Sequence, residues 1–184
     1  MKNYYLIHSG IQHIQQSALA FNECQLLEMF FTSFAIKENW HKYIPNIHHK
    51  KISKILSLRM MDGIPSNKIY NAPNYEFIEI MIRMVIGKNN FSINILPHWR
   101  DRNFAKKIIT KIDPNCKGIF GFPNNLLESF KHVSSSSIKM IEQPIGHISS
   151  AMQIFKEEQI LCPEFSDSIT FNDTNTAYLE RINE

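Results

Sequence analysis

Two short segments hold the residues whose types and spacing could do chemistry, residues 9–13 (Ser-Gly-Ile-Gln-His) and residues 141–147 (Ile-Glu-Gln-Pro-Ile-Gly-His). Each segment follows an apolar run that predicts a buried strand, and each precedes a segment with helical character. In open α/β sheets, ligands bind in the crevice beyond the carboxyl ends of the strands. His13 and His147 are therefore expected to reach one site from opposite halves of the chain.

The neighbours of these histidines complete the predicted site. Gly10 and Gly146 would let the backbone approach a ligand closely, and Ser9 and Glu142 would offer polar side chains. The helix predicted from Ile148 would present unpaired N–H groups, which suit a phosphate or another anion. For each histidine the alternative is a residue that hydrogen-bonds its own loop. For Glu142 the alternative is a strand-end residue that faces water.

The elements that must position these residues follow from hydrophobic patterning. A strand over 4–7, a helix over 15–23 and a second strand over 26–34 predict a βαβ opening with parallel strands. Two further strands are predicted at 117–120 and 138–142, and a weaker one at 91–95. Helices are predicted over 47–59, 75–86 (largely buried), 100–112, from Pro123 through Phe130 and from Ile148 to Phe155. This alternation predicts one Rossmann-like α/β domain, with a mostly parallel sheet of about five to seven strands and helices on both faces.

Composition limits the functional classes. The chain has 184 residues, so residues 1–184 are expected to form a single domain, and a net charge of +3 is too small to indicate nucleic acid as a partner. Cys24, Cys116 and Cys162 have neither a disulfide nor a zinc-binding spacing, which favours a reducing compartment. The N-terminal apolar run is too short for a signal peptide and no run approaches a membrane span, so we expect a cytoplasmic protein.

Several catalytic motifs are missing from the sequence. It lacks G-x-G-x-x-G, G-x-x-x-x-G-K-[ST] and G-x-S-x-G, which disfavours dinucleotide oxidoreductases, P-loop kinases and α/β hydrolases. An Asp-x-Asp pair is also missing, so a metal-dependent nucleotide-sugar enzyme that uses this device is disfavoured. His48 and His49 are adjacent and cannot share a helix face, and with His41 they fit a solvated basic surface better than a metal site. No metal and no cofactor are expected.

Several segments along the chain match those of one family, in the same order. They are His8-Ser9-Gly10 with His13, the helix segment Gln16 to Ala20, Thr32-Ser33, Arg100-Asp101-Arg102, Phe122 to Phe130 with Leu127 and Glu128, and the turn Glu142 to His147. Through these segments nearly the whole chain resembles the N-terminal domain of GT-B-fold retaining glycosyltransferases of family 4.

The resemblance implies the acceptor-side half of an enzyme of glycan or polysaccharide synthesis. Such an enzyme moves a sugar from a nucleotide-sugar donor to a sugar or lipid-linked acceptor. His13 would line the acceptor crevice, and His147 would approach the donor sugar as the catalytic histidine. Enzymes of this family continue into a second Rossmann-like domain that holds most donor contacts. We expect that domain to be absent from residues 1–184 and the chain to be inactive alone. The alternatives are a non-catalytic binding or accessory module on the same fold and a small complete enzyme.

A basic segment over 41–59 predicts a further partner. It contains His41, Lys42, His48, His49, Lys50, Lys51, Lys54 and Arg59, with Ile47, Ile52, Ile55 and Leu56 at helical spacing from residue 47 onward. Each basic residue near an anionic leaflet contributes about 1 kcal/mol, so this segment could recruit the protein weakly to the inner face of the membrane. The alternative is a solvated helix with a basic outer face.

Overall fold

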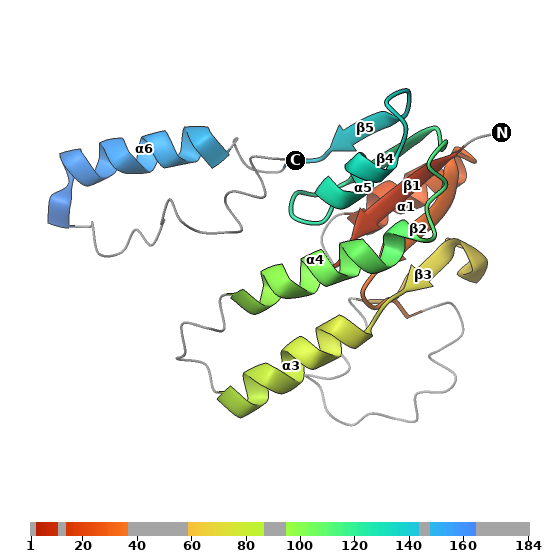
Figure 1. Cartoon of the computed structure of the whole chain (residues 1–184), viewed down its shortest axis with the longest axis horizontal. Coiled ribbons are helices and arrows are strands. Elements are labelled where there is room, and N and C mark those ends of the chain that lie inside the picture. Colours follow the sequence, from red (N-terminus) through yellow and green to blue (C-terminus); the bar gives the residue numbers. More distant parts are fainter. Residues whose placement is uncertain (1–2, 11–13, 37–58, 87–94, 144–147, 165–184) are drawn as a thin grey trace.

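A computed structural model of the chain describes residues 3–10, 14–36, 59–86, 95–143 and 148–164 (Figure 1). The strands are β1 (Tyr4–His8), β2 (Leu27–Thr32), β3 (Ile69–Asn71), β4 (Gly118–Gly121) and β5 (Ile138–Ile141). The helices are α1 (Ile14–Glu23), α3 (Asn74–Ile86), α4 (Leu96–Ile109), α5 (Leu127–His132) and α6 (Ile148–Leu161), with a short 3-10 helix η2 (Ser66–Lys68) before β3.

The described strands form one sheet in the order β3-β2-β1-β4-β5. Every neighbouring pair is parallel, which confirms the predicted parallel α/β sheet. The chain builds β1, β2 and β3 outward in one direction and then returns to the other side of β1 for β4 and β5. The strand order therefore reverses between β1 and β4, and in folds of this kind that reversal marks the crevice where ligands bind.

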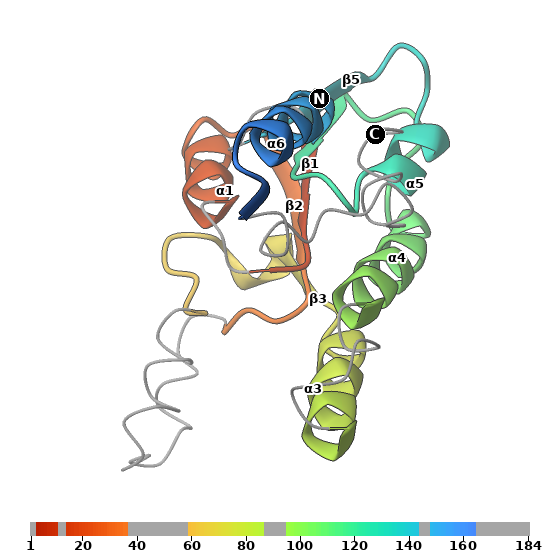
Figure 2. The same cartoon turned by 90° about the vertical axis from the view of Figure 1, so that its left-hand side faces the viewer.

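Helices cover both faces of the sheet, as predicted (Figure 2). Side chains of a strand alternate between its two faces, so consecutive residues of β1 enter different cores. Leu6 packs in the core on the α1 side, whereas Ile7 packs in the core that includes Phe104 of α4 and Phe130 of α5. Burial on both sides explains why β1 is apolar along most of its length.

The glycine that ends β4 lets β1 and β4 approach closely. A side-chain carbon added to Gly121 would lie 2.3 Å from the carbonyl oxygen of Ile7 and 2.8 Å from a methyl group of Leu126. No residue with a side chain fits at this position without moving the backbone of the central strand. The pairing of β1 with β4 at the reversal of strand order therefore depends on this glycine.

The main differences from the predicted elements concern β3, α4 and α5. The strand β3 was not predicted, because it has only three residues and lies between turn-forming segments. The helix α4 begins at Leu96 rather than at Arg100, with Pro97 in its first turn. The helix α5 begins at Leu127 rather than at Pro123, because Asn124 takes a left-handed conformation with φ of 89° and interrupts the helix there.

The helix α3 forms as predicted, but the prediction that it is largely buried is wrong. Its apolar side chains face solvent, with Met84 75% and Val85 83% exposed, whereas its acidic residues Glu76 and Glu79 face the protein. Helical spacing identified the helix without indicating which side packs, because ion pairs to other elements decide its orientation.

Some predictions fall on residues outside the described ranges. These are the basic segment up to residue 58 and residues 91–94 of the predicted strand. Among the described residues, no helix is both long and apolar enough to cross a membrane.

Candidate functional site

The loops after β1 and β4 meet at the carboxyl edge of the sheet, where the strand order reverses. Ser9 follows β1 directly, and its hydroxyl donates a hydrogen bond of 2.6 Å to Asp101 Oδ1 on α4. Asn125, in the loop after β4, donates to Ser9 Oγ at 3.4 Å. With its amide turned over, Asn125 instead accepts from the Ser9 N–H at 3.2 Å and donates to the Phe122 carbonyl at 3.3 Å. In either orientation Asn125 joins the two loops.

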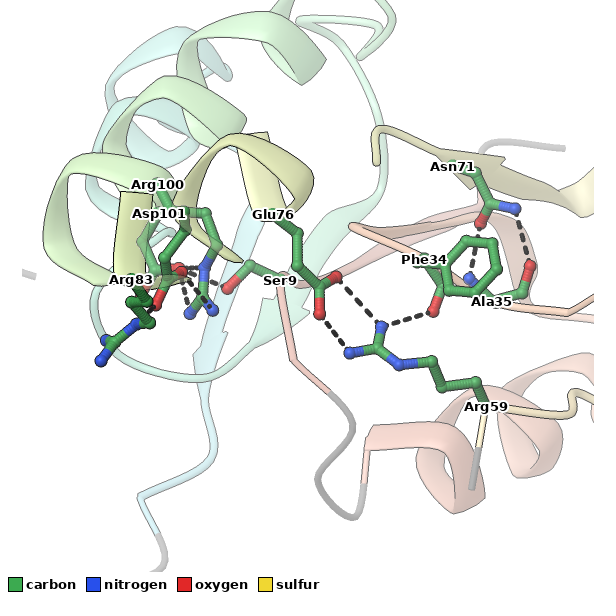
Figure 3. A network of polar contacts seen from close by, with 10 residues as sticks. Ser9, Phe34, Ala35, Arg59, Asn71, Glu76, Arg83, Arg100 and Asp101 are labelled. Carbon is green, nitrogen blue, oxygen red and sulfur yellow. Dashed lines mark hydrogen bonds and ion pairs between the residues drawn. The ribbon is translucent and has the colours of Figure 1, made fainter. Parts of the chain in front are cut away.

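A buried ion-pair network extends from this contact to α3 (Figure 3). Arg100 lies 2.8 Å from Asp101 Oδ1 and 3.0 Å from Glu79 Oε2. Burial raises the pKa of the Asp101 carboxyl, although the charge of Arg100 and the hydrogen bond from Ser9 both act to lower it. Ser9 and Asp101 are only 2% and 7% exposed, so their hydrogen bond lies below the protein surface and supports the backbone that follows β1.

His8, the last residue of β1, faces the opposite side of the sheet from Ser9. Its ring packs against Phe122 with 5.0 Å between the ring centroids. Neither ring nitrogen has a hydrogen-bond partner among the described residues, although the residue is only 8% exposed. Burial, together with the nearby charge of Arg100, lowers the pKa of His8 from 6.5 to about 4. The imidazole is therefore neutral at pH 7.

Gly10 provides the space for this histidine. A side-chain carbon at Gly10 would lie 2.9 Å from Nε2 of the His8 ring. The sequence prediction gave Gly10 the role of admitting a ligand close to the backbone. In the structure its missing side chain accommodates His8.

Glu142 stands at the same edge, just beyond the end of β5. Its backbone N–H donates to the carbonyl of Gly121 at 2.8 Å, and its carboxylate accepts a long hydrogen bond of 3.5 Å from Ser17 of α1. β5 is two strands from β1, and strands are about 4.8 Å apart, so Glu142 and Ser9 end their strands about 10 Å apart. Ser9, Gly10 and Glu142 thus lie at the carboxyl edge of the sheet, and Glu142 is more accessible than the buried Asp101. Their role in a binding site stays a prediction.

The other predicted site residues, His13, Gly146 and His147, lie outside the described residues. Their assignment stays a prediction.

Sequence reasoning did not assign His8, Asp101 and Asn125 to the site. Asp101 lies in a segment noted for its family resemblance, but its contact with Ser9 joins residues 92 positions apart. Asn124-Asn125 after Pro123 carried a usable signal, because asparagine is the residue other than glycine that most readily takes a left-handed turn. His8 carried none, because a histidine that ends a strand has the same sequence signature whether it is buried or exposed.

A hollow beside Asn125 is too small for a substrate. It lies between α4 and the start of α5 and has a volume of about 10 Å³, room for one water molecule. Its lining residues are Arg102, Ala105, Asn124, Asn125, Leu127 and Glu128. Among the described residues no group of three His, Cys, Asp or Glu side chains could hold a metal ion.

Comparisons of the chain with protein-family models, with curated proteins and with solved structures found no match.

Proposed function

We propose that the chain is the acceptor-side domain of a glycosyltransferase that moves a sugar from a nucleotide-sugar donor to a sugar or lipid-linked acceptor. One observation carries the proposal. Segments that resemble the family 4 enzymes are far apart in the sequence, yet Ser9, Asp101 and the loop that holds Asn125 contact one another at the reversal of strand order. These segments therefore meet where parallel α/β folds bind ligands, which supports the proposal.

On this proposal each part of the edge has a separate task. The Ser9–Asp101–Asn125 contacts hold the loop after β1, so the backbone at Gly10 is presented in a fixed shape. Glu142 accepts hydrogen bonds from sugar hydroxyls. His13 lines the acceptor crevice, and His147 approaches the donor sugar, where it positions hydroxyls or stabilises developing charge. In the resembling family a second domain supplies most donor contacts, so the chain alone binds an acceptor without completing the transfer.

A specific observation favours the competing function, a binding or accessory module without catalysis. The buried carboxylate at the strand reversal, Asp101, is already bonded to Ser9 and Arg100, and the neighbouring His8 is buried and neutral. These groups stabilise the loop and do not reach a substrate. Catalysis would then have to come from residues such as His147.

A titration followed by NMR tests the proposal. The ¹⁵N-labelled chain is titrated with a panel of simple glycosides as acceptors and, separately, with nucleotide sugars. We expect saturable shifts of the Ser9, Gly10 and Glu142 amides with at least one glycoside, and no release of nucleotide from any donor. Ser9→Ala should weaken glycoside binding because the loop loses its anchor. Ser137→Ala should not weaken it, because Ser137 makes a comparable buried hydrogen bond of 2.8 Å to the Cys116 carbonyl before β5, at the opposite edge.

Two results would contradict the proposal in different ways. If no glycoside binds, the edge serves another ligand class and the accessory-module function gains support. If the chain alone hydrolyses a nucleotide sugar and His147→Ala abolishes that activity, the chain is a complete enzyme on one domain.

A further inference from the structure

The orientation of α3 is the reverse of that expected for a surface helix in water. Its acidic residues Glu76 and Glu79 face the protein, with side chains only 13% and 7% exposed. Glu76 pairs with Arg59, which also contacts the Phe34 carbonyl (Figure 3). Glu79 pairs with Arg83 and Arg100. The polar side of the helix is therefore committed to internal contacts.

The apolar side of α3 faces outward. We call it the α3 outer face, and it consists of Phe77 (56% exposed), Ile78 (44%), Ile80 (41%), Met81 (60%), Met84 (75%) and Val85 (83%). At 100° per residue these positions form one continuous side of the helix. Exposure is greatest near the C-terminal end of α3, which lies away from the sheet in both views (Figures 1 and 2).

Such a surface is costly in water. Apolar surface is stabilised by about 25 cal/mol for each Å² removed from solvent, and soluble proteins rarely align so many large apolar side chains on one exposed helix. The polar residues of α3 could have faced solvent, yet they are paired inside. The outer face is therefore best explained as a surface that a membrane or another molecule covers.

The charges on α3 and its neighbour α4 indicate what covers the outer face. The acidic residues of the two helices, Glu76, Glu79 and Asp101, all lie in buried or nearly buried ion pairs. The charges that reach solvent on the described residues of the helix pair are basic, with Arg102 and Lys106 exposed. Arg83 and Lys107 add partial exposure. The helix pair thus combines an apolar stripe with positive charge only.

We propose that the α3 outer face docks on the surface of a lipid bilayer that contains anionic lipids. A bilayer interface offers both an apolar layer for the stripe and negative headgroups for the basic residues. The helix has 13 residues and is about 20 Å long, so it lies in the interface and does not cross the membrane. A second copy of the chain fits less well, because a strip about 20 Å by 10 Å falls below the roughly 800 Å² per partner of a stable interface. The proposal does not depend on the proposed function.

Vesicle flotation tests it with the full chain. The protein is mixed with vesicles of phosphatidylcholine that contain phosphatidylglycerol, and separately with vesicles of phosphatidylcholine alone. We expect binding to the anionic vesicles that decreases as salt is added, because salt screens exposed charges. Equal binding to both kinds of vesicle, or binding to neither, would overturn the proposal.

A matched pair of double variants locates the contact. Met84→Gln/Val85→Gln changes the two most exposed residues of the outer face, so the core is untouched, and it should reduce the partition coefficient about tenfold or more. Ile160→Gln/Leu161→Gln is the control, because these residues also lie near the end of a helix, in α6, and are equally exposed at 81% and 74%. The control should bind as the unmodified protein does. Equal losses in the two variants would overturn the assignment to α3.

Light scattering on the same proteins without lipid tests whether a second copy of the chain covers the outer face. If the unmodified chain is a dimer, the Met84→Gln/Val85→Gln variant is a monomer and neither binds vesicles, a second copy covers the outer face and the lipid proposal is overturned. A monomer in both cases, together with vesicle binding, supports it.

Discussion

At the scale of single residues, the end of β1 places two neighbouring polar residues in opposite environments. Ser9 faces α4 and donates a hydrogen bond to the carboxylate of Asp101. His8 faces the core on the α1 side and packs against Phe122, without a hydrogen-bond partner among the described residues. The alternation of side chains along a strand explains the difference. Ser9 contributes a bond that anchors a loop, and His8 contributes a buried group that resists protonation.

The buried histidine predicts a loss of stability in acid. The pKa of His8 is lowered from 6.5 to about 4, so between these values the unfolded chain binds more protons than the folded one. The contribution to stability is complete above pH 6.5 and falls by about 3 kcal/mol as the pH drops to 4. Urea unfolding across this range should give a smaller decrease for His8→Phe, which keeps an aromatic ring and cannot take a proton. The raised pKa of Asp101 makes the protein more stable as the pH falls. This effect is the same in the unmodified protein and in His8→Phe, so it cancels when the two are compared. If the free energy of unfolding decreases equally with pH in both proteins, His8 is not the titrating group.

The Ser9–Asp101 bond predicts strong coupling between two substitutions. Asp101→Asn should destabilise the fold by about 2–3 kcal/mol, because the largely buried Arg100 loses one of its two ion pairs and keeps only Glu79. Ser9→Ala should cost about 1 kcal/mol. In a double-mutant cycle measured by urea unfolding, the two effects should be non-additive by about 1 kcal/mol or more. Ser9→Ala combined with Ser137→Ala, at the opposite edge, should be additive. Additivity in both pairs would show that Ser9 and Asp101 act independently.

The candidate site was predictable only where sequence order implies position. Ser9, Gly10 and Glu142 follow strands directly, and parallel strands end at a common edge, so their placement could be inferred. Asp101 and Asn125 reach the same edge from a helix and a loop, and their contacts depend on how α4 and the loop after β4 pack. Patterns of a few residues carry no information about such distant contacts.

At the scale of elements, α3 shows that periodicity predicts a helix better than its orientation. Its apolar residues outnumber its polar ones, which suggested burial. The ion pairs of Glu76 and Glu79 with Arg59 and Arg100 fix the polar side inward instead. Each of these arginines belongs to a different segment, so the sequence of α3 alone could not reveal them.

The basic segment before α3 carries a separate prediction. If residues 41–59 contribute to recruitment, changing Lys50, Lys51 and Lys54 to Gln should weaken binding to anionic vesicles and reduce its dependence on salt. Flotation of this triple variant beside the unmodified chain measures the effect. Unchanged binding would leave the segment as a solvated basic surface and would not bear on the α3 outer face, which is tested by different residues.

At the scale of the whole molecule, the fold class followed from the alternation of strands and helices, and the order of the strands did not. Apolar runs separated by helical segments are sufficient to predict a parallel sheet covered on both faces. The position of β4 beside β1 depends on the close approach at Gly121, and β3 is too short to register as a pattern. The reversal of strand order, which defines the candidate crevice, therefore became visible only in three dimensions.

The pairing of the first strand with the fourth also has a consequence during synthesis. β1 can pair with β2 soon after both leave the ribosome, but its other edge is completed only by Gly118–Gly121, more than a hundred residues later. At about 5–20 residues per second this edge waits for several seconds. During that time the unpaired backbone of Leu6 and Ile7 is open to pairing with a neighbouring nascent chain. The strand pair that forms the crevice is thus completed late, and until then one edge of the central strand is exposed to incorrect pairing.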